Sequence, residues 1–176
     1  MDWELKFMSW ANDWWSSPVL DQIIPWLTFL GSHIAVLLFI ILSWILMKQR
    51  KVLYRLTLLY GIQSAVIYGL KFLIKRERPL FFLDMVSRLS KGPGEILDPS
   101  FPSGHAVYAF MMATLLATWF PRYRVAFFIL AGLIAWTRIY LGLHYPTDVM
   151  AGALLGYACT KLFIHYTDGL KIEAHH

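Results

Sequence analysis

The chain has 176 residues, of which 58% are hydrophobic and only 15% are charged, and its formal net charge is +5. An ordinary soluble domain has an apolar share of roughly 45–50%, so the composition excludes that class and predicts one membrane domain, with the lipid bilayer as its partner and no nucleic acid. The single cysteine, Cys159, excludes an internal disulfide bond. We expect no cleavable signal peptide, because the first 18 residues carry four tryptophans and alternating charges instead of a basic start and an apolar run.

Residues 1–30 are predicted to form an interfacial amphipathic segment. Four aromatic residues recur at helical spacing on one face, with the charged residues mostly elsewhere, as in a helix that lies in the membrane surface. Tryptophan favours that depth. The second part, Pro18 to Leu30, contains Asp21 and Pro25, and it either runs along the surface, which we favour, or leads into the first span. The four aromatic residues are Trp3, Phe7, Trp10 and Trp14.

Residues 31–166 are predicted to form the membrane domain, followed by a C-terminal tail at 167–176. A span needs about 20 mainly apolar residues, and five segments approach or reach that length. The expected fold class is therefore all-α, a polytopic membrane helical bundle of five spans plus the N-terminal interfacial helices. In the fifth segment Lys161 is close enough to the end to snorkel to the surface, and Gly152 and Gly156 indicate helix packing. The segments are Leu27–Met47, Leu53–Leu73, Gly104–Phe120, Val125–Leu143 and Val149–His165.

Two short basic connections indicate the orientation of the bundle. Residues 48–55 join the first two spans, and residues 121–124 join the third and fourth. The preference of Lys and Arg for cytoplasmic loops places both connections in the cytoplasm. The opposite side of the membrane carries an equal number of Lys and Arg residues. The cytoplasmic side has the excess only when Lys71, Arg78 and Arg138 are counted separately as site residues.

Polar residues from three separate junctions then fall on the other side of the membrane. Arg138, His144 and Asp148 interrupt an otherwise apolar region, where charged groups are costly and usually mark a functional site. Pro146 suits the first position of a helix, which puts the Asp148 carboxylate in the first turn and within reach of the His144 ring. The pair combines a possible nucleophile with a group that orients it.

The other two junctions add cations and a helix N-terminus. Lys71 and Arg78 stand seven residues apart, so they share a face if the helix continues to Arg78, and Pro79 then helps to stop it. The next span begins within Pro102–His105, where free backbone N–H groups and the helix dipole favour an anion. Three cations, two histidines and a helix N-terminus on one side predict a site for a phosphate.

These motifs resemble the three-part signature of the type 2 phosphatidic acid phosphatase superfamily, the lipid phosphate phosphatases. Their order and internal spacing agree, and the resemblance runs from about residue 27 to residue 165. One position departs, because Thr137 stands where the family often has serine, and both side chains carry a hydroxyl. The motifs are Lys71-x6-Arg78-Pro79, Pro102-Ser103-Gly104-His105 and Arg138-x5-His144-x3-Asp148.

The resemblance implies a lipid phosphatase that needs no metal or other cofactor, in a bacterial cytoplasmic (inner) membrane with its active site facing the periplasm or the cell exterior. His144 would attack phosphorus and become a phosphohistidine, Asp148 would hold its ring, and His105 would protonate the leaving oxygen. Compact bacterial members act on phosphatidylglycerophosphate, undecaprenyl diphosphate or the 1-phosphate of lipid A, and the motifs do not separate these substrates. The residues implied to hold the phosphoryl oxygens are Lys71, Arg78, Arg138, Ser103 and Gly104.

Other functions and plainer roles stay open from the residues alone. A transferase would pass the phosphoryl or head group to a lipid acceptor, and a non-catalytic anion-binding membrane protein would keep the cations without needing His144 opposite Asp148. Taken singly, Ser103 is explained as a helix N-cap and Asp148 as a favourable first-turn acid. His33 and His165 are interpreted as interfacial residues with satisfied hydrogen bonds.

The longest connection, residues 80–101, has two interpretations. Its apolar residues, Phe81 and Phe82 among them, either form an amphipathic segment that rests on the outer leaflet and guides a lipid sideways into the site, or anchor an ordinary surface loop. Substrate specificity is expected to reside in this connection and in the N-terminal helices.

Overall fold

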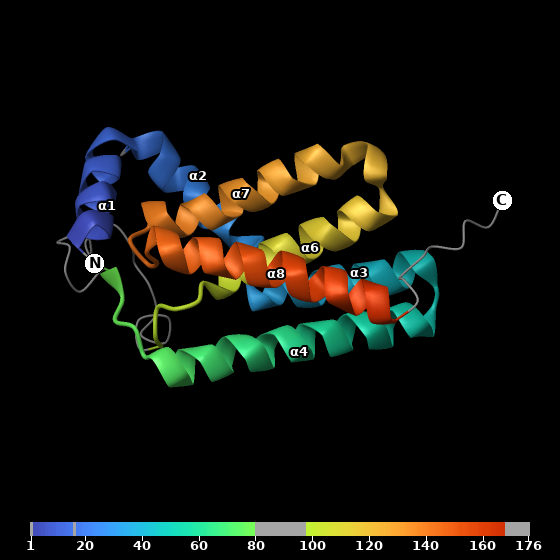
Figure 1. The fold of residues 1–176 in the computed structure, drawn as a ribbon. Coiled ribbons are helices and arrows are strands. Elements are labelled where there is room, and N and C mark those ends of the chain that lie inside the picture. The colour runs from blue at the N-terminus through green and yellow to red at the C-terminus, as the bar shows by residue number, and fades with distance from the viewer. Residues whose placement is uncertain (1, 16, 80–97, 168–176) are drawn as a thin grey trace.

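The computed structural model describes residues 2–15, 17–79 and 98–167, and within these ranges every regular element is a helix. The long helices run side by side, and the first helix packs across one end of them (Figure 1). In chain order the helices are α1 (Asp2–Trp15), α2 (Pro18–Phe29), α3 (His33–Met47), α4 (Arg50–Ile74), α6 (Gly104–Trp119), the 3-10 turn η3 (Pro121–Tyr123), α7 (Arg124–Tyr140) and α8 (Pro146–Tyr166).

Three helices are long and apolar enough to cross a membrane. These are α4 with 25 residues, α8 with 21, and α7 together with η3 with 20. The pair α2 and α3, bent by 52°, meets the same criterion only as a unit. On their own, α3 has 15 residues and α6 has 16, which at 1.5 Å per residue gives about 23 Å against a hydrocarbon core of about 30 Å. The helical membrane class is confirmed, whereas the count of five spans stays a prediction.

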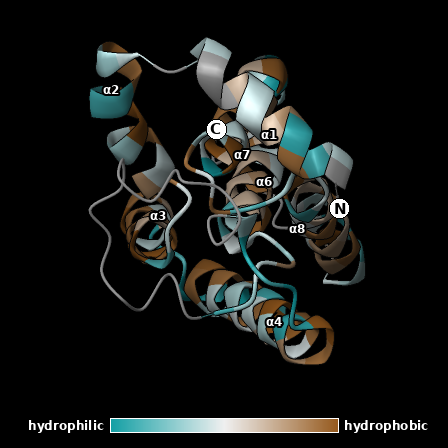
Figure 2. Ribbon diagram, turned by 90° about the vertical axis from the view of Figure 1, so that its left-hand side faces the viewer, coloured by the Kyte–Doolittle hydropathy of each residue, from teal (hydrophilic) through white to brown (hydrophobic). Residues whose placement is uncertain are grey.

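Helix α6 lies in the middle of the bundle, with the other helices around it (Figure 2). Its contact with α8 depends on two glycines. A Cβ atom on Gly152 would lie 2.5 Å from the carbonyl oxygen of Ser103, and one on Gly156 would lie 2.2 Å from that of Val107. The two backbones therefore touch, as the Gly-x-x-x-Gly pattern predicts. This close approach sets the start of α6 against the first turns of α8.

The outward faces of the bundle are apolar. Figure 2 shows hydrophobic residues on the outer sides of α3 and α4, and Leu46, Phe72 and Leu73 are 72%, 72% and 75% exposed. Soluble proteins rarely leave such a surface to water. Lipid is the environment that suits these faces.

Helix α1 meets the bundle through a stripe that includes an acid. Glu4, Met8 and Ala11 are 3%, 1% and 2% exposed, whereas Trp3 and Trp14 are 59% and 75% exposed. The tryptophan face thus points away from the protein, which fits a helix in the membrane surface. Glu4, in contrast, is not on a water-facing side, because it forms buried contacts with the bundle.

The predicted division into an interfacial segment (1–30), a membrane phosphatase domain (31–166) and a tail (167–176) stays a prediction. The two interpretations of the connection 80–101 concern mainly residues 80–97, which lie outside the described residues. Of the predicted tail, only Thr167 is described, and it closes α8 by donating its backbone N–H to the Phe163 carbonyl oxygen at 3.1 Å.

Candidate active site

Three connections meet at the end of the bundle that α1 covers (Figure 1): residues 75–79, 98–103 and 141–145. They border a cavity of about 350 Å³. Six of the eight predicted site residues line it, and the other two, Ser103 and Asp148, are fully buried beside it. The lining residues are His33, Ile67, Tyr68, Lys71, Arg78, Asp98, Gly104, His105, Tyr108, Arg138 and His144.

The two cations of the first motif do not lie on one continuous helix. Helix α4 ends at Ile74, and Lys75 closes it in a left-handed conformation with φ of 49°. Arg78 follows in a non-helical connection, where its guanidinium donates to the carbonyl oxygens of Asp98 at 2.9 Å and Leu143 at 3.0 Å. The condition for a shared helical face, a helix that continues to Arg78, is therefore not met, and tertiary hydrogen bonds bring this arginine into the cavity.

His144 lies between a cation and a carboxylate. Its Nε2 atom is 3.5 Å from Nη1 of Arg78, and its Nδ1 atom is 3.8 Å from Oδ2 of Asp148. The second distance exceeds a hydrogen bond, and catalytic contacts are often long before substrate binds. Burial, reinforced by the neighbouring cations and opposed by Asp148, lowers the pKa of His144 to about 3. The ring is therefore neutral at neutral pH, and a proton on the Asp148 side leaves the Nε2 lone pair free.

Asp148 is held in the first turn of α8, which begins at Pro146 as predicted. Its Oδ2 atom accepts hydrogen bonds from the backbone N–H of Tyr145 at 2.9 Å and from the Ser100 hydroxyl at 2.5 Å. The same hydroxyl lies 3.5 Å from Nδ1 of His144. Ser100, which the motif pattern does not include, therefore connects the carboxylate to the histidine.

Arg76 ties Asp148 to the N-terminal helix. Its Nη1 atom donates to Oδ1 of Asp148 at 2.6 Å, and its Nη2 atom donates to Oε2 of Glu4 at 2.5 Å. Oε1 of Glu4 accepts from the backbone N–H of Thr147 at 3.2 Å and from its hydroxyl at 2.7 Å. In the sequence, Glu4 and Arg76 stand among other charged residues, so spacing alone singles out neither of them.

Asp98 places a carboxylate among the cations of the cavity. It pairs with Lys71 at 2.8 Å and with Arg78, and its side chain is 37% exposed. Burial alone raises the pKa of the Asp98 carboxyl, but the hydrogen bond and charge of Lys71, together with Arg78, outweigh it and hold the pKa below its usual range. A carboxylate thus sits where the sequence predicts a phosphate. Its one sequence signal is its place five residues before Ser103.

The start of α6 faces the same cavity. Ser103 is the N-cap of α6, yet its side chain makes no capping hydrogen bond, and its buried hydroxyl has no partner within the described part of the chain. A capping role alone therefore does not explain Ser103. A buried hydroxyl without a partner beside a cavity suits a bound polar ligand. Arg138, another lining residue of the cavity, is 2% exposed and donates to the Thr28 hydroxyl at 2.8 Å.

His33 belongs to the rim of the cavity. Its Nδ1 atom is 2.7 Å from the Tyr60 hydroxyl and its Nε2 atom is 3.3 Å from the Tyr68 hydroxyl. These contacts agree with a histidine whose hydrogen bonds are satisfied, but its place in the lining was not indicated by the sequence. Among residues 2–15, 17–79 and 98–167, no three His, Cys, Asp or Glu side chains are grouped to hold a metal ion, and independence from metals stays a prediction.

Known proteins resemble this chain across most of its membrane region. Residues 51–171 match the PAP2 superfamily. Lipid A 1-phosphatase of Rhizobium etli is 41% identical over 88 residues, which make up 49% of this chain and 38% of that protein. Phosphatidylglycerophosphatase B of Bacillus subtilis is 30% identical over 168 residues, which make up 88% of this chain and 78% of that protein.

The fold is shared as well. The crystal structure of LpxE from Aquifex aeolicus has a TM-score of 0.75 at 28% identity, covering 92% of this chain and 94% of that chain. The chain spans about two fifths of the length of the lipid A 1-phosphatase that it matches. Because the family match extends from residue 51 to residue 171 of a chain of 176, the chain belongs to the PAP2 superfamily.

Proposed function

We propose that this protein removes a phosphate from a phosphomonoester or diphosphate carried by a membrane lipid, through a phosphohistidine at His144. The observation that carries the proposal is the cavity in which His144 faces Lys71, Arg78 and Arg138. Phosphoryl transfer asks mainly for positioning and for stabilisation of negative charge, and this arrangement offers both. The relatives named above act, by their names, on lipid A and on phosphatidylglycerophosphate.

In the proposed first step, Nε2 of His144 forms a bond to phosphorus while the bond to the lipid oxygen breaks. Asp148 stabilises the positive charge that develops on the ring, and His105 gives its proton to the leaving oxygen. In the second step, water attacks the phosphohistidine, the nitrogen–phosphorus bond breaks, and His105 takes a proton from the water. Free phosphate leaves, and the neutral His144 and protonated His105 are restored.

The cations and the start of α6 hold the phosphoryl oxygens in this mechanism. Lys71 and Arg78 lie against Asp98, so an incoming phosphate replaces one carboxylate with a more highly charged anion. The Ser103 hydroxyl and the N–H groups at Gly104 supply uncharged donors. Preorganised donors of this kind typically contribute 10² to 10³ each to the rate, by order of magnitude.

A lipid substrate is supported by an apolar groove next to the polar cavity. The groove, of about 270 Å³, lies between α3, α6 and α7, and every residue that lines it is apolar. Groove and cavity are neighbours at Gly31, where a Cβ atom would lie 2.8 Å from the Ile134 side chain of the groove and 3.0 Å from the carbonyl oxygen of His105, a residue of the cavity lining. Acyl or prenyl chains fit the groove while the phosphate occupies the cavity.

The proposed setting is a bacterial cytoplasmic membrane with the active site on the periplasmic or outer side. The protein is a multi-pass helical membrane protein. The basic connections 48–55 and 121–124 lie at the opposite end of the bundle from the cavity (Figure 1), and cytoplasmic loops are the ones enriched in Lys and Arg.

Release of inorganic phosphate from a lipid panel tests the proposal. Purified protein receives phosphatidylglycerophosphate, undecaprenyl diphosphate or lipid A 1-phosphate, with and without EDTA. We expect release from at least one lipid that is insensitive to EDTA and absent in His144→Ala. Activity that requires added metal ion contradicts the mechanism, and a new lipid product without free phosphate identifies a transferase instead.

A further inference from the structure

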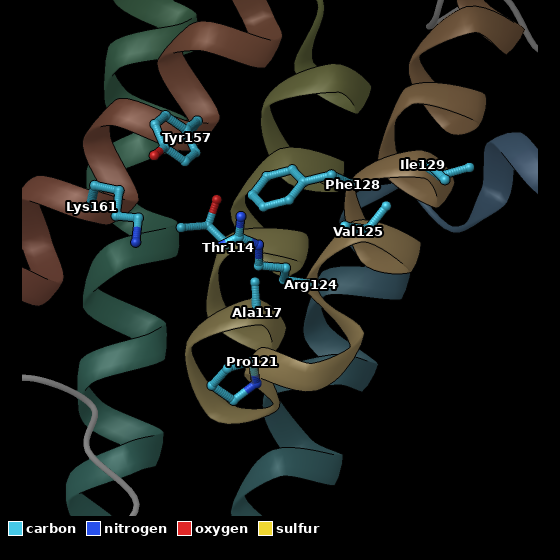
Figure 3. Close-up of a pocket in the computed structure, with 9 residues that line it drawn as sticks. All are labelled: Thr114, Ala117, Pro121, Arg124, Val125, Phe128, Ile129, Tyr157 and Lys161. Atoms are coloured by element: carbon cyan, nitrogen blue, oxygen red, sulfur yellow. The ribbon is translucent and has the colours of Figure 1, made fainter.

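A second cavity, of about 680 Å³, lies at the opposite end of the bundle from His144. Figure 3 shows Tyr157 and Lys161 of α8 on one side, Arg124 and Phe128 of α7 on the other, and Thr114 of α6 between them. The PAP2 motifs contribute no residue to this cavity. It is therefore separate from the proposed catalytic site.

The cavity carries two cations and no carboxylate. Arg124 and Lys161 are its only charged lining residues. Within the described residues, neither cation forms a hydrogen bond or an ion pair through its side chain, and Lys161 lies only over the Tyr157 ring, with Nζ 6.0 Å from the centroid. An anion placed between the two cations therefore meets no competing acid.

The walls are apolar and aromatic. The rings of Phe128 and Tyr157 meet edge to face, with centroids 5.9 Å apart, and they join α7 to α8 along one side. Val125 and Ile129 are 64% and 59% exposed on the outer surface of α7. Because these residues face outward on an apolar bundle, the cavity opens toward lipid chains.

The depth of the cations matches a lipid head group. Arg124 is the first residue of α7, and Lys161 stands five residues before the end of α8 at Tyr166, which at 1.5 Å per residue is about 7.5 Å from that end. A lysine at that depth reaches the head-group level by snorkelling. These positions near the helix ends suit the level at which the phosphate of a phospholipid meets its chains.

We propose that this cavity binds an anionic phospholipid of the leaflet opposite the active site. The phosphodiester lies between Arg124 and Lys161, and an acyl chain lies along Val125, Phe128 and Ile129. Basic pockets between membrane helices bind anionic head groups in this manner. The binding does not depend on the catalytic proposal, and in the proposed orientation the leaflet is the cytoplasmic one.

Lipid binding by the full chain in a neutral detergent tests the site. Short-chain phosphatidylglycerol, a diester that has no phosphomonoester to hydrolyse, is titrated against the melting temperature, with phosphatidylcholine in a parallel series. We expect the phosphatidylglycerol to raise the melting temperature at lower concentration than phosphatidylcholine does. Its affinity should fall roughly five-fold in Arg124→Gln or Lys161→Gln and roughly 25-fold in the double variant.

Arg122→Gln is the matched control, because Arg122 is an exposed cation of the same connection that lies over Tyr123 and does not line the cavity. It should keep the parental affinity. Equal responses to both lipids, an equal loss in Arg122→Gln, or an equal shift with inorganic phosphate would each overturn the proposal. The variants must show the parental melting temperature without added lipid; a variant that unfolds is replaced by Val125→Trp, which fills the cavity and should also abolish the preference.

Discussion

The cations at the two ends of the bundle differ in their acidic partners and in their exposure. At the His144 end, Lys71 and Arg78 share Asp98, and Arg76 is held between two acids. At the other end, Arg124 and Lys161 have no acidic partner within the described residues. The first set is buried or partly buried, with side-chain exposures of 7%, 4% and 20%, whereas the second is exposed.

Desolvation explains the difference. A buried charge is costly unless a partner compensates it, and the carboxylates of Asp98, Glu4 and Asp148 compensate Lys71, Arg78 and Arg76. An exposed cation has no such cost and can take its counter-ion from the membrane. Substitutions at the His144 end should therefore change catalysis by large factors, and substitutions at the other end should change lipid affinity by small ones.

The largest effect is expected for His144→Ala, which removes the proposed nucleophile. Phosphate release should fall on the order of 10⁴ to 10⁶, as when the nucleophile of another hydrolase is removed. The measurement is initial rate on the preferred lipid, together with acid-labile labelling of the protein by radioactive phosphate, which His144→Ala should lose. If the variant retains near-parental turnover, His144 is not the nucleophile of this site.

The next effect is expected for Arg78→Gln, at roughly 10² to 10³ in kcat/KM, because one preorganised donor to the phosphoryl oxygens is lost. Lys75→Gln is the matched control, since Lys75 belongs to the same connection but is exposed and lies over Phe72. Its kcat/KM should stay within a few-fold of the parent. Equal losses in the two variants would mean that overall positive charge, and not the paired cation in the cavity, drives the reaction.

Much of the fold was predictable from the sequence. The apolar segments, the helix start at Pro146 and the role of Gly152 and Gly156 in helix packing follow from local rules that need no tertiary information, whereas their partner helix α6 does not. The end of α4 at Ile74 was not predictable from the sequence. Arg78 has a high helical propensity, and the hydrogen bonds that hold it outside a helix come from residues 98 and 143, which are distant in sequence.

The site residues that belong to the three motifs were predictable from the sequence. The residues that reach the site only through tertiary contacts were not. Six predicted residues line one cavity, because the motifs flank helices that end on the same side. Glu4, Arg76 and Asp98 were not predictable. Their roles arise only when α1 packs over the α8 start and when the segment before α6 folds back onto α4, and neither event leaves a spacing pattern in the chain.

A smaller effect is expected for Glu4→Gln, in which Arg76 loses one of its two acids. We expect a loss of roughly 10- to 100-fold in kcat, with little change in KM, because a hydrogen bond to a charged group contributes about 1.5–3 kcal/mol. Lys6→Gln, an exposed cation on the same helix, should leave both readouts unchanged.

A double-mutant cycle separates positioning from folding in this case. If Glu4 acts through Arg76, the double variant Glu4→Gln/Arg76→Gln should be no slower than Arg76→Gln alone, which is strong non-additivity between contacting groups. Fully additive losses, or a fall in melting temperature that accounts for the lost activity, would show that Glu4 only anchors α1 to the bundle.

The smallest effect is expected for Asp98→Asn. Asp98 competes with phosphate for Lys71 and Arg78, but its side chain is 37% exposed, so solvent screens the competition and pairs of this kind contribute at most about 1 kcal/mol. Inhibition by inorganic phosphate should therefore become roughly three- to five-fold tighter, measured as the competitive inhibition constant at neutral pH. The low pKa of Asp98 keeps its carboxylate charged at that pH, so the competition is fully present in the parent and weakens only as the pH falls through that low value. Weaker inhibition in Asp98→Asn would mean that this carboxylate holds Lys71 and Arg78 in place for the phosphate instead of competing with it. The ion pairs of Asp98 would then serve to assemble the site.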